Sequence, residues 1–250
     1  MASLSARSLA GIPEVRAGDE LAELIAAALA GERLDAGAVV AVAHSAVSKA
    51  EGAVVELAQV RPEERARRLA AEQGKDARMV QVVLDESAQV LRSERGVLIC
   101  RTRHGLVCAN AGVDNSNAAP ETLLLLPRDP DASARRIRAG LRQLGVGAPA
   151  VLISDSFGRA WRHGQTDVAI GLAGMQPLDD WRGRTDAHGL ELRATLLAVA
   201  DAAAGAADLA RRKDSREPVV ILEGLERFVS DADGPGALAL VRPLEEDLFR

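Results

Sequence analysis

The stretch AVLISDSFGRAWR, residues 150–162, decides the fold, because a short apolar run leads directly into an acidic turn. Residues 150–153 have the length and composition of a buried strand. The same order occurs earlier, where the apolar residues 97–100 and 106–108 precede ANAGVDNSN, residues 109–117. The sequence therefore predicts two sets of strands that each end in an aspartate-bearing loop, one with Asp114 and one with Asp155.

Helices and further strands are predicted between and around these loops. Residues 39–43 and 218–222 are short apolar runs typical of buried strands, and a loop is expected at residues 44–52. Asp129 before Pro130 indicates a helix that begins there and runs to residue 144. Further helices are expected at residues 20–30 with Asp19 as the cap, at 62–71, at 76–91 and at 188–212.

Interleaved helices and hairpin-like strand pairs favour a mixed α+β fold over a doubly wound parallel sheet. No linker, repeat or low-complexity stretch divides the chain, so two intimate lobes are expected to form one functional unit. Residues 1–10 are small and polar and are expected to be a flexible tail. Residues 11–250 are then the functional domain.

Composition excludes several classes of protein. The 250 residues contain 2% aromatic side chains and no Tyr, and the net charge is −5. Stacking on bases and a basic binding face are therefore unavailable, so no nucleic-acid partner is expected. The sequence has no signal peptide and no apolar run of membrane-spanning length, which predicts a cytoplasmic protein without membrane contact.

Cys100 and Cys108 lie on the two apolar stretches that flank the turn at residues 103–105. We interpret them as buried thiols in a reducing compartment; a disulfide or a metal pair is the alternative. One pair lacks the four ligands of a structural zinc site. His104 in the intervening turn is either a general base or a structural histidine.

The two acidic loops suggest phosphoryl chemistry. Asp114 and Asp155, with the hydroxyl of Ser156 beside the latter, suit a hard divalent cation that also takes phosphate oxygens. The alternative is that both aspartates are ordinary turn or cap residues. Lys49 is either a phosphate contact or a solvated lysine. Arg159 and Arg162 are either a phosphate clamp or surface partners of Trp161. The sequence has no Walker-type or dinucleotide-binding glycine motif, so a nucleotide must be held by metal and scattered cations.

Several stretches together resemble the coenzyme F420-0:L-glutamate ligase family. The likeness follows the family order over nearly the whole chain, and the two acidic-loop stretches are its most specific parts. The matching segments are residues 11–14, 47–52, 102–114, 125–127, 129–134, 155–159 and 164–171.

The resemblance implies a GTP-dependent, amide-forming ligase that adds L-glutamate to F420-0 through an acyl phosphate. It implies Mn²⁺ or Mg²⁺ as metal, K⁺ as helper, and a homodimer of mixed α+β subunits. Asp114 and Asp155 are then catalytic metal ligands, and Ser156 is a third ligand where the family usually has Thr. Positions that contact GTP in the family are Gly11, Ile12, Pro13, Glu14, His44, Ser45, Lys49 and Asn117, and Arg159 is expected to meet the same anionic charge. No nitroreductase-like domain, as some relatives carry, is expected after residue 250.

Two departures from the family pattern stand out. Ser45 occupies a position where many relatives have Lys, and the family's glutamine metal ligand corresponds to Arg212 or Lys213. The glutamine belongs to a second metal site that the resemblance implies, and a cation in its place cannot ligate a metal. The two departures motivate the alternative of an altered paralogue that binds deazaflavin or nucleotide without ligating. A metal-dependent phosphohydrolase that cleaves GTP without an acceptor is the third hypothesis.

Overall fold

The computed structural model describes residues 3–247. A five-stranded sheet forms its centre, and its strands are β1 (Ser5–Ser8), β2 (Val39–Ala43), β8 (Ala150–Arg159), β9 (Arg162–Ala173) and β12 (Val219–Glu223). The strand order is β1–β12–β2–β8–β9. Within this sheet β2 and β8 are parallel neighbours, whereas the remaining neighbours are antiparallel. A mixed sheet with interleaved helices confirms the predicted α+β fold.

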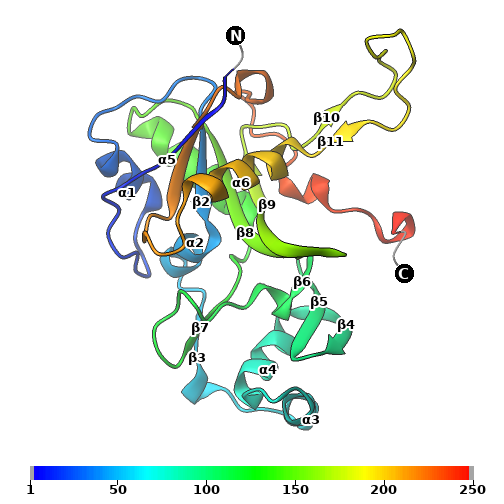
Figure 1. Ribbon diagram of the computed structural model, residues 1–250. Coiled ribbons are helices and arrows are strands. Elements are labelled where there is room, and N and C mark those ends of the chain that lie inside the picture. Colours follow the sequence, from blue (N-terminus) through cyan, green and yellow to red (C-terminus); the bar gives the residue numbers. More distant parts are fainter. Residues whose placement is uncertain (1–2, 248–250) are drawn as a thin grey trace.

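Helices cover both faces of the sheet (Figure 1). The helices α1 (Leu21–Ala28), α2 (His44–Ala50) and α5 (Pro130–Gln143) pack on one face, and α6 (Val199–Ala210) packs on the other. Side chains alternate between the faces of a strand, so β2 contributes Val40 and Val42 to the first core and Val39 and Ala41 to the second. The result is three layers, helix–sheet–helix.

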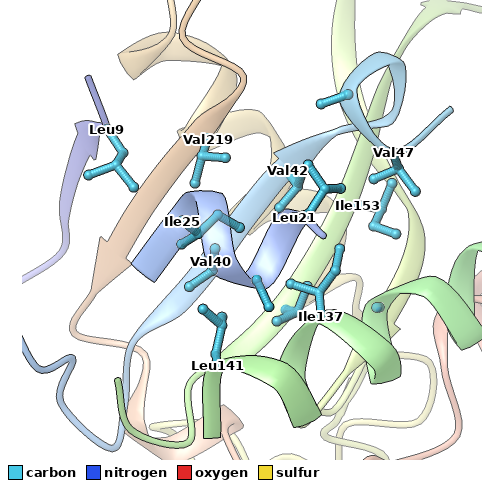
Figure 2. Close-up of a cluster of buried hydrophobic side chains, with 14 of the residues drawn as sticks. Leu9, Leu21, Ile25, Val40, Val42, Val47, Ile137, Leu141, Ile153 and Val219 are labelled. Atoms are coloured by element: carbon cyan, nitrogen blue, oxygen red, sulfur yellow. The ribbon is translucent and has the colours of Figure 1, made fainter. Parts of the chain in front are cut away.

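The first core is almost entirely aliphatic. Figure 2 shows side chains from α1 and α5 meeting those of the central strands; the labelled residues are Leu9, Leu21, Ile25, Val40, Val42, Val47, Ile137, Leu141, Ile153 and Val219. A fully buried Leu, Ile or Val stabilises the fold by about 1.5–3 kcal/mol, so this cluster can hold the sheet without aromatic rings.

Residues 54–124 form a second unit, called the small lobe here, which lies below the sheet in Figure 1. It has its own buried core, in which Val80, Val83 and Leu98 pack together. A three-stranded sheet ordered β4–β5–β6 and the pair β3–β7 provide its strands. Its elements are β3 (Val54–Glu56), α3 (Glu64–Gln73), α4 (Ala77–Asp85), β4 (Ser87–Glu94), β5 (Val97–Thr102), β6 (Val107–Ala109) and β7 (Thr122–Leu124).

A third feature is an arm, residues 177–198, that projects from the sheet unit (Figure 1). Its strands β10 (Asp179–Asp180) and β11 (Leu196–Leu197) pair antiparallel. The remaining elements are short 3₁₀ turns: η1 (Leu57–Gln59), η2 (Asn110–Gly112), η3 (Glu226–Phe228), η4 (Ala237–Leu240) and η5 (Leu244–Glu246). Within the described part of the chain, no helix combines the length and the apolar character needed to cross a membrane.

Several predicted elements are confirmed. The strand predicted at residues 39–43 is β2, and the strand predicted at 218–222 is β12, shifted by one residue. The helix predicted from Asp129 is α5, and the Asp129 carboxylate accepts a hydrogen bond from the Ala132 amide at 2.9 Å. Strong local signals, a proline at the start and a capping carboxylate, explain this success.

The prediction of a flexible tail at residues 1–10 is wrong for the part that the structure describes. Ser5–Ser8 form the edge strand β1, which pairs antiparallel with β12. The Ser5 hydroxyl also donates to the Glu223 carboxylate at 3.0 Å. A polar strand of four residues depends on main-chain pairing with a distant segment, which leaves no apolar pattern to recognise. Residues 1–2 of this prediction lie outside the described residues.

Two predicted helices are too long. The helix predicted at 76–91 ends at Asp85, and β4 begins at Ser87, whose hydroxyl donates to the Val83 carbonyl at 2.5 Å. The helix predicted at 188–212 begins at Val199, because residues 188–198 belong to the arm. In both cases pairing with another strand overrides local helix propensity.

Two segments predicted as loops form a helix and a hairpin, and the predicted cap of α1 is not the observed one. The segment after β2 forms α2, and the acidic turn at residues 154–162 continues β8 as a long hairpin with β9. The cap of α1 is Glu20, without a side-chain hydrogen bond, while the Asp19 carboxylate accepts from the Arg16 amide at 2.7 Å. The hairpin extends because β9 supplies a partner for every residue up to the tip.

Candidate active site

A pocket of about 660 Å³ lies between the sheet unit and the small lobe. Its walls come from segments far apart in the sequence, and several of these segments are polar and lie beside the central strands. The lining includes residues 12–15, 43–46, 108–110, 112–117, 154–158 and 211–213 together with Lys49, Asp167 and residues 216–218.

Asp155 lies on β8 and is largely buried. Its Oδ1 atom is 3.3 Å from Nε2 of the buried His44 and accepts a hydrogen bond from the Ser156 amide at 2.7 Å. Burial raises the pKa of the Asp155 carboxyl, and the charges of Asp167 and Asp114 add to this rise; His44 and the Ser156 amide oppose it. On balance, the surroundings of Asp155 disfavour its ionised form.

Asp114 reaches the same pocket from the small lobe. Its main chain forms a bridge with Leu124, through hydrogen bonds of 2.9 and 2.8 Å. Its carboxylate accepts from the Ser116 amide and hydroxyl, both at 2.7 Å, and from the Asn117 amide at 3.0 Å. Burial alone would raise the pKa of Asp114, but the hydrogen bonds from Ser116 and Asn117 outweigh it and lower the pKa. The loop thus holds Asp114 as an ionised group in a fixed orientation.

The structure brings most of the predicted site residues together. The pocket lining contains Ile12, Pro13, Glu14, His44, Ser45, Lys49, Asp114, Asn117, Asp155 and Ser156. Gly11 and Arg159 are outside it. Arg159 ends β8 at the exposed tip of the hairpin, where its guanidinium donates to the His163 carbonyl at 2.7 Å. The prediction expected the strand to end before Arg159 and so put this residue at the site. The hairpin instead extends further and carries Arg159 away from the pocket.

Lys49 and Glu14, both predicted from the family likeness, contact each other. The Lys49 ammonium donates to the Glu14 carboxylate at 2.5 Å, and this hydrogen bond lowers the pKa of Glu14. Lys49 lies in the last turn of α2 rather than in a loop. The pair joins the N-terminal segment to the pocket wall.

Asp167 and Arg211 are site residues that the sequence reasoning missed. Asp167 is buried on β9, accepts hydrogen bonds from Ser154 Oγ at 2.7 Å and Ser156 Oγ at 2.6 Å, and forms an ion pair with Arg211. Arg211, at the end of α6, also donates to Ser154 Oγ at 3.1 Å. The alternation of Ser154 and Ser156 along β8 places both hydroxyls on one face, and this period of two was the available signal.

The remaining candidates have structural roles. His104 lies outside the pocket lining, and its Nε2 atom is 3.0 Å from the Pro127 carbonyl. Cys100 and Cys108 face each other on β5 and β6 and are free and buried, which confirms that they are buried thiols; the reducing compartment stays a prediction. Burial raises the pKa of Cys108 to about 12, so this pocket-lining thiol is protonated near neutral pH and is no nucleophile.

The pocket has the donor chemistry for a hard cation, although the protein side chains do not complete a site. Asp114 and Asp155 offer carboxylate oxygens, the ligands that Mg²⁺ and Mn²⁺ prefer. Among residues 3–247, no group of three or more His, Cys, Asp or Glu side chains is arranged to hold a metal ion. A cation here would therefore need water or substrate oxygens as further ligands, as is usual for metals that bind phosphates.

The fold and the pocket define a two-lobed α+β protein with buried carboxylates and basic side chains around one cavity. Residues 11–224 match the model of the family described as F420-0:Gamma-glutamyl ligase. The chain is 44% identical over 239 residues to the Coenzyme F420:L-glutamate ligase of Methanopyrus kandleri, covering 95% of this chain and 94% of that protein. It is 42% identical over 243 residues to the enzyme of that name from Methanothermobacter thermautotrophicus, covering 96% of both chains. With the Archaeoglobus fulgidus protein of the same name, identity is 39% over 242 residues, covering 96% of this chain and 94% of that protein. The chain belongs to the F420-0:gamma-glutamyl ligase family, as its sequence motifs had implied.

Proposed function

We propose that this protein ligates L-glutamate to coenzyme F420-0 at the expense of GTP, through an acyl phosphate. One observation carries the proposal: Asp114 of the small lobe and Asp155 of the sheet line one pocket, and the charge of Asp114 contributes to the raised pKa of Asp155. Family membership supplies the substrates named for its relatives.

Asp114 and Asp155 are the residues that would hold Mn²⁺ or Mg²⁺. Such an ion, when bound, neutralises charge on phosphate oxygens. Ser156 was predicted as a third ligand and stays a prediction; its hydroxyl donates to Asp167 and accepts from Lys213 at 2.8 Å. K⁺ and the homodimer also stay proposals that rest on the family likeness.

The reaction needs an activated carboxyl group, because a carboxylate does not form an amide with an amine in water. A carboxylate oxygen of F420-0 attacks the γ-phosphorus of GTP, and GDP leaves. The glutamate nitrogen then attacks the acyl carbon, the C–O bond to phosphate breaks, and the amine proton passes to the departing phosphate or to water.

Transfer of this kind depends on positioning and on charge neutralisation. Lys49, Lys213 and Arg216 line the pocket and supply positive charge for phosphate oxygens. The ion pair of Asp167 with Arg211 fixes Ser154 and Ser156, and so holds the strand that carries Asp155. The chain's own residues therefore orient the reactants, while GTP provides the driving force.

Incubation with F420-0, GTP, Mn²⁺ and L-glutamate, followed by mass analysis and GDP quantification, tests the proposal. We expect a product heavier by one or more glutamyl units, and GDP formation that requires F420-0. GDP formation without F420-0 would identify a phosphohydrolase. Binding of GTP and F420-0 without turnover would identify an altered paralogue, the hypothesis motivated by Ser45 and by the basic residues after α6.

A further inference from the structure

Three consecutive basic residues follow α6 at the pocket wall, and the structure gives each a different partner. The guanidinium of Arg211 is buried against Asp167. The guanidinium of Arg212 pairs with Asp214, and both of these side chains are more than 70% exposed. The Lys213 side chain is 70% exposed as well, but its ammonium contacts Ser156 and Asp208 at the pocket wall. Of the two residues that the family resemblance left as candidates, both line the pocket, and Lys213 is the one whose charged group contacts Ser156.

The Lys213 ammonium lies among three oxygen atoms. Its Nζ atom is 2.8 Å from Ser156 Oγ, 3.2 Å from Asp208 Oδ1 and 3.9 Å from Asp167 Oδ1. Carboxylate and hydroxyl oxygens are the surroundings that a hard metal ion takes. An ammonium has three donors and no lone pair, so it fills such a place without being able to ligate a metal itself.

We propose that Lys213 is a tethered cation that takes the place of a second divalent ion, so that the pocket binds one such ion, at Asp114 and Asp155. This inference rests on the proposed function only for the position of that single ion. Lys213 is a positioning residue: it holds Ser156 and offers one positive charge to the phosphate groups of the substrate.

The number of Mn²⁺ ions bound per chain tests this proposal. Free Mn²⁺ is counted by electron paramagnetic resonance during titration with Mn²⁺ alone, for the wild type, for Lys213→Gln and for the control Arg212→Gln. The Lys213 side chain is 70% exposed, and exposed pairs contribute little to stability, so the variants should fold. Circular dichroism verifies that they do.

We expect one Mn²⁺ per chain for the wild type and for Arg212→Gln, and two for Lys213→Gln, whose amide oxygen can ligate. Two ions in the wild type, none in the wild type, or one in folded Lys213→Gln would overturn the proposal. Because the count needs neither GTP nor F420-0, a failure of glutamate ligation does not contradict the proposal about Lys213. Conversely, a wrong count leaves the ligation assay unaffected.

Discussion

Two carboxylates in one pocket have opposite electrostatic surroundings. Hydrogen bonds from Ser116 and Asn117 outweigh burial and lower the pKa of Asp114, whereas burial and neighbouring carboxylates raise the pKa of Asp155. Asp114 and Asp155 were predictable, because each follows an apolar run at a place where oxygen ligands suit a metal–phosphate complex. Asp167 was missed, because the local pattern of β9 does not distinguish it from a surface residue. The available signal was on β8, in the spacing of Ser154 and Ser156, which contact Asp167 together with Arg211.

Replacing Asp155 tests the role of the buried carboxylate. Asp155→Asn keeps the shape and removes the charge, so we expect GTP-dependent glutamate ligation to fall by about 100-fold or more, which corresponds to about 3 kcal/mol of lost transition-state stabilisation. Thermal unfolding should show no loss of stability, because burial already disfavours the charged form. Asp35→Asn, at an exposed position outside the pocket lining, is the matched control. Unchanged turnover in the Asp155 variant would exclude this residue from the mechanism.

Elements with strong local signals were predicted with good bounds, and those that depend on distant partners were not. β2 and α5 follow from an apolar run and from a capped, proline-started helix. β1, by contrast, exists because it pairs with β12, more than 200 residues away in the chain. The start of α6 and the end of α4 were also missed because strands compete with the helices for the same residues.

The N-cap of α5 is expected to contribute measurably to stability. Asp129→Ala removes the acceptor of the Ala132 amide and should lower the free energy of unfolding by about 1 kcal/mol. Asp129→Asn keeps an oxygen at the same place and should be nearly neutral. Urea unfolding of the three proteins provides the measurement; equal losses in both variants would show that the cap itself is not responsible.

The ion pair of Arg211 with Asp167 joins the end of α6 to β9. Both side chains are nearly inaccessible, so Arg211→Met should lower the free energy of unfolding by about 3 kcal/mol, because it removes the buried partner of Asp167 and leaves this carboxylate paired with the exposed Lys213 ammonium alone, 3.9 Å away. The double variant Arg211→Met, Asp167→Asn should recover much of that loss in a denaturant titration. A double variant as unstable as the single one would show that the lost charge pairing is not the cause.

At the scale of the whole molecule, the pocket exists only because two lobes meet. The small lobe supplies Asp114 and Asn117, and the sheet unit supplies Asp155, His44 and Lys49. The sequence allowed two intimate lobes and a convergence of the two acidic segments, and the structure shows both segments at one pocket. Local patterns could not show that Arg159 lies outside the pocket lining or that Arg211 belongs to it, because both positions depend on how far β8 and α6 extend.

The central claim is that GTP phosphorylates the F420-0 carboxylate in this pocket before glutamate attacks. It is tested most directly with F420-0 that carries ¹⁸O in that carboxylate, by mass analysis of the phosphate released during ligation. The acyl carbon–oxygen bond breaks when the amine attacks, so the account predicts one ¹⁸O atom in each phosphate formed with product. Release of unlabelled phosphate would contradict the account, whether or not a glutamate is joined to F420-0.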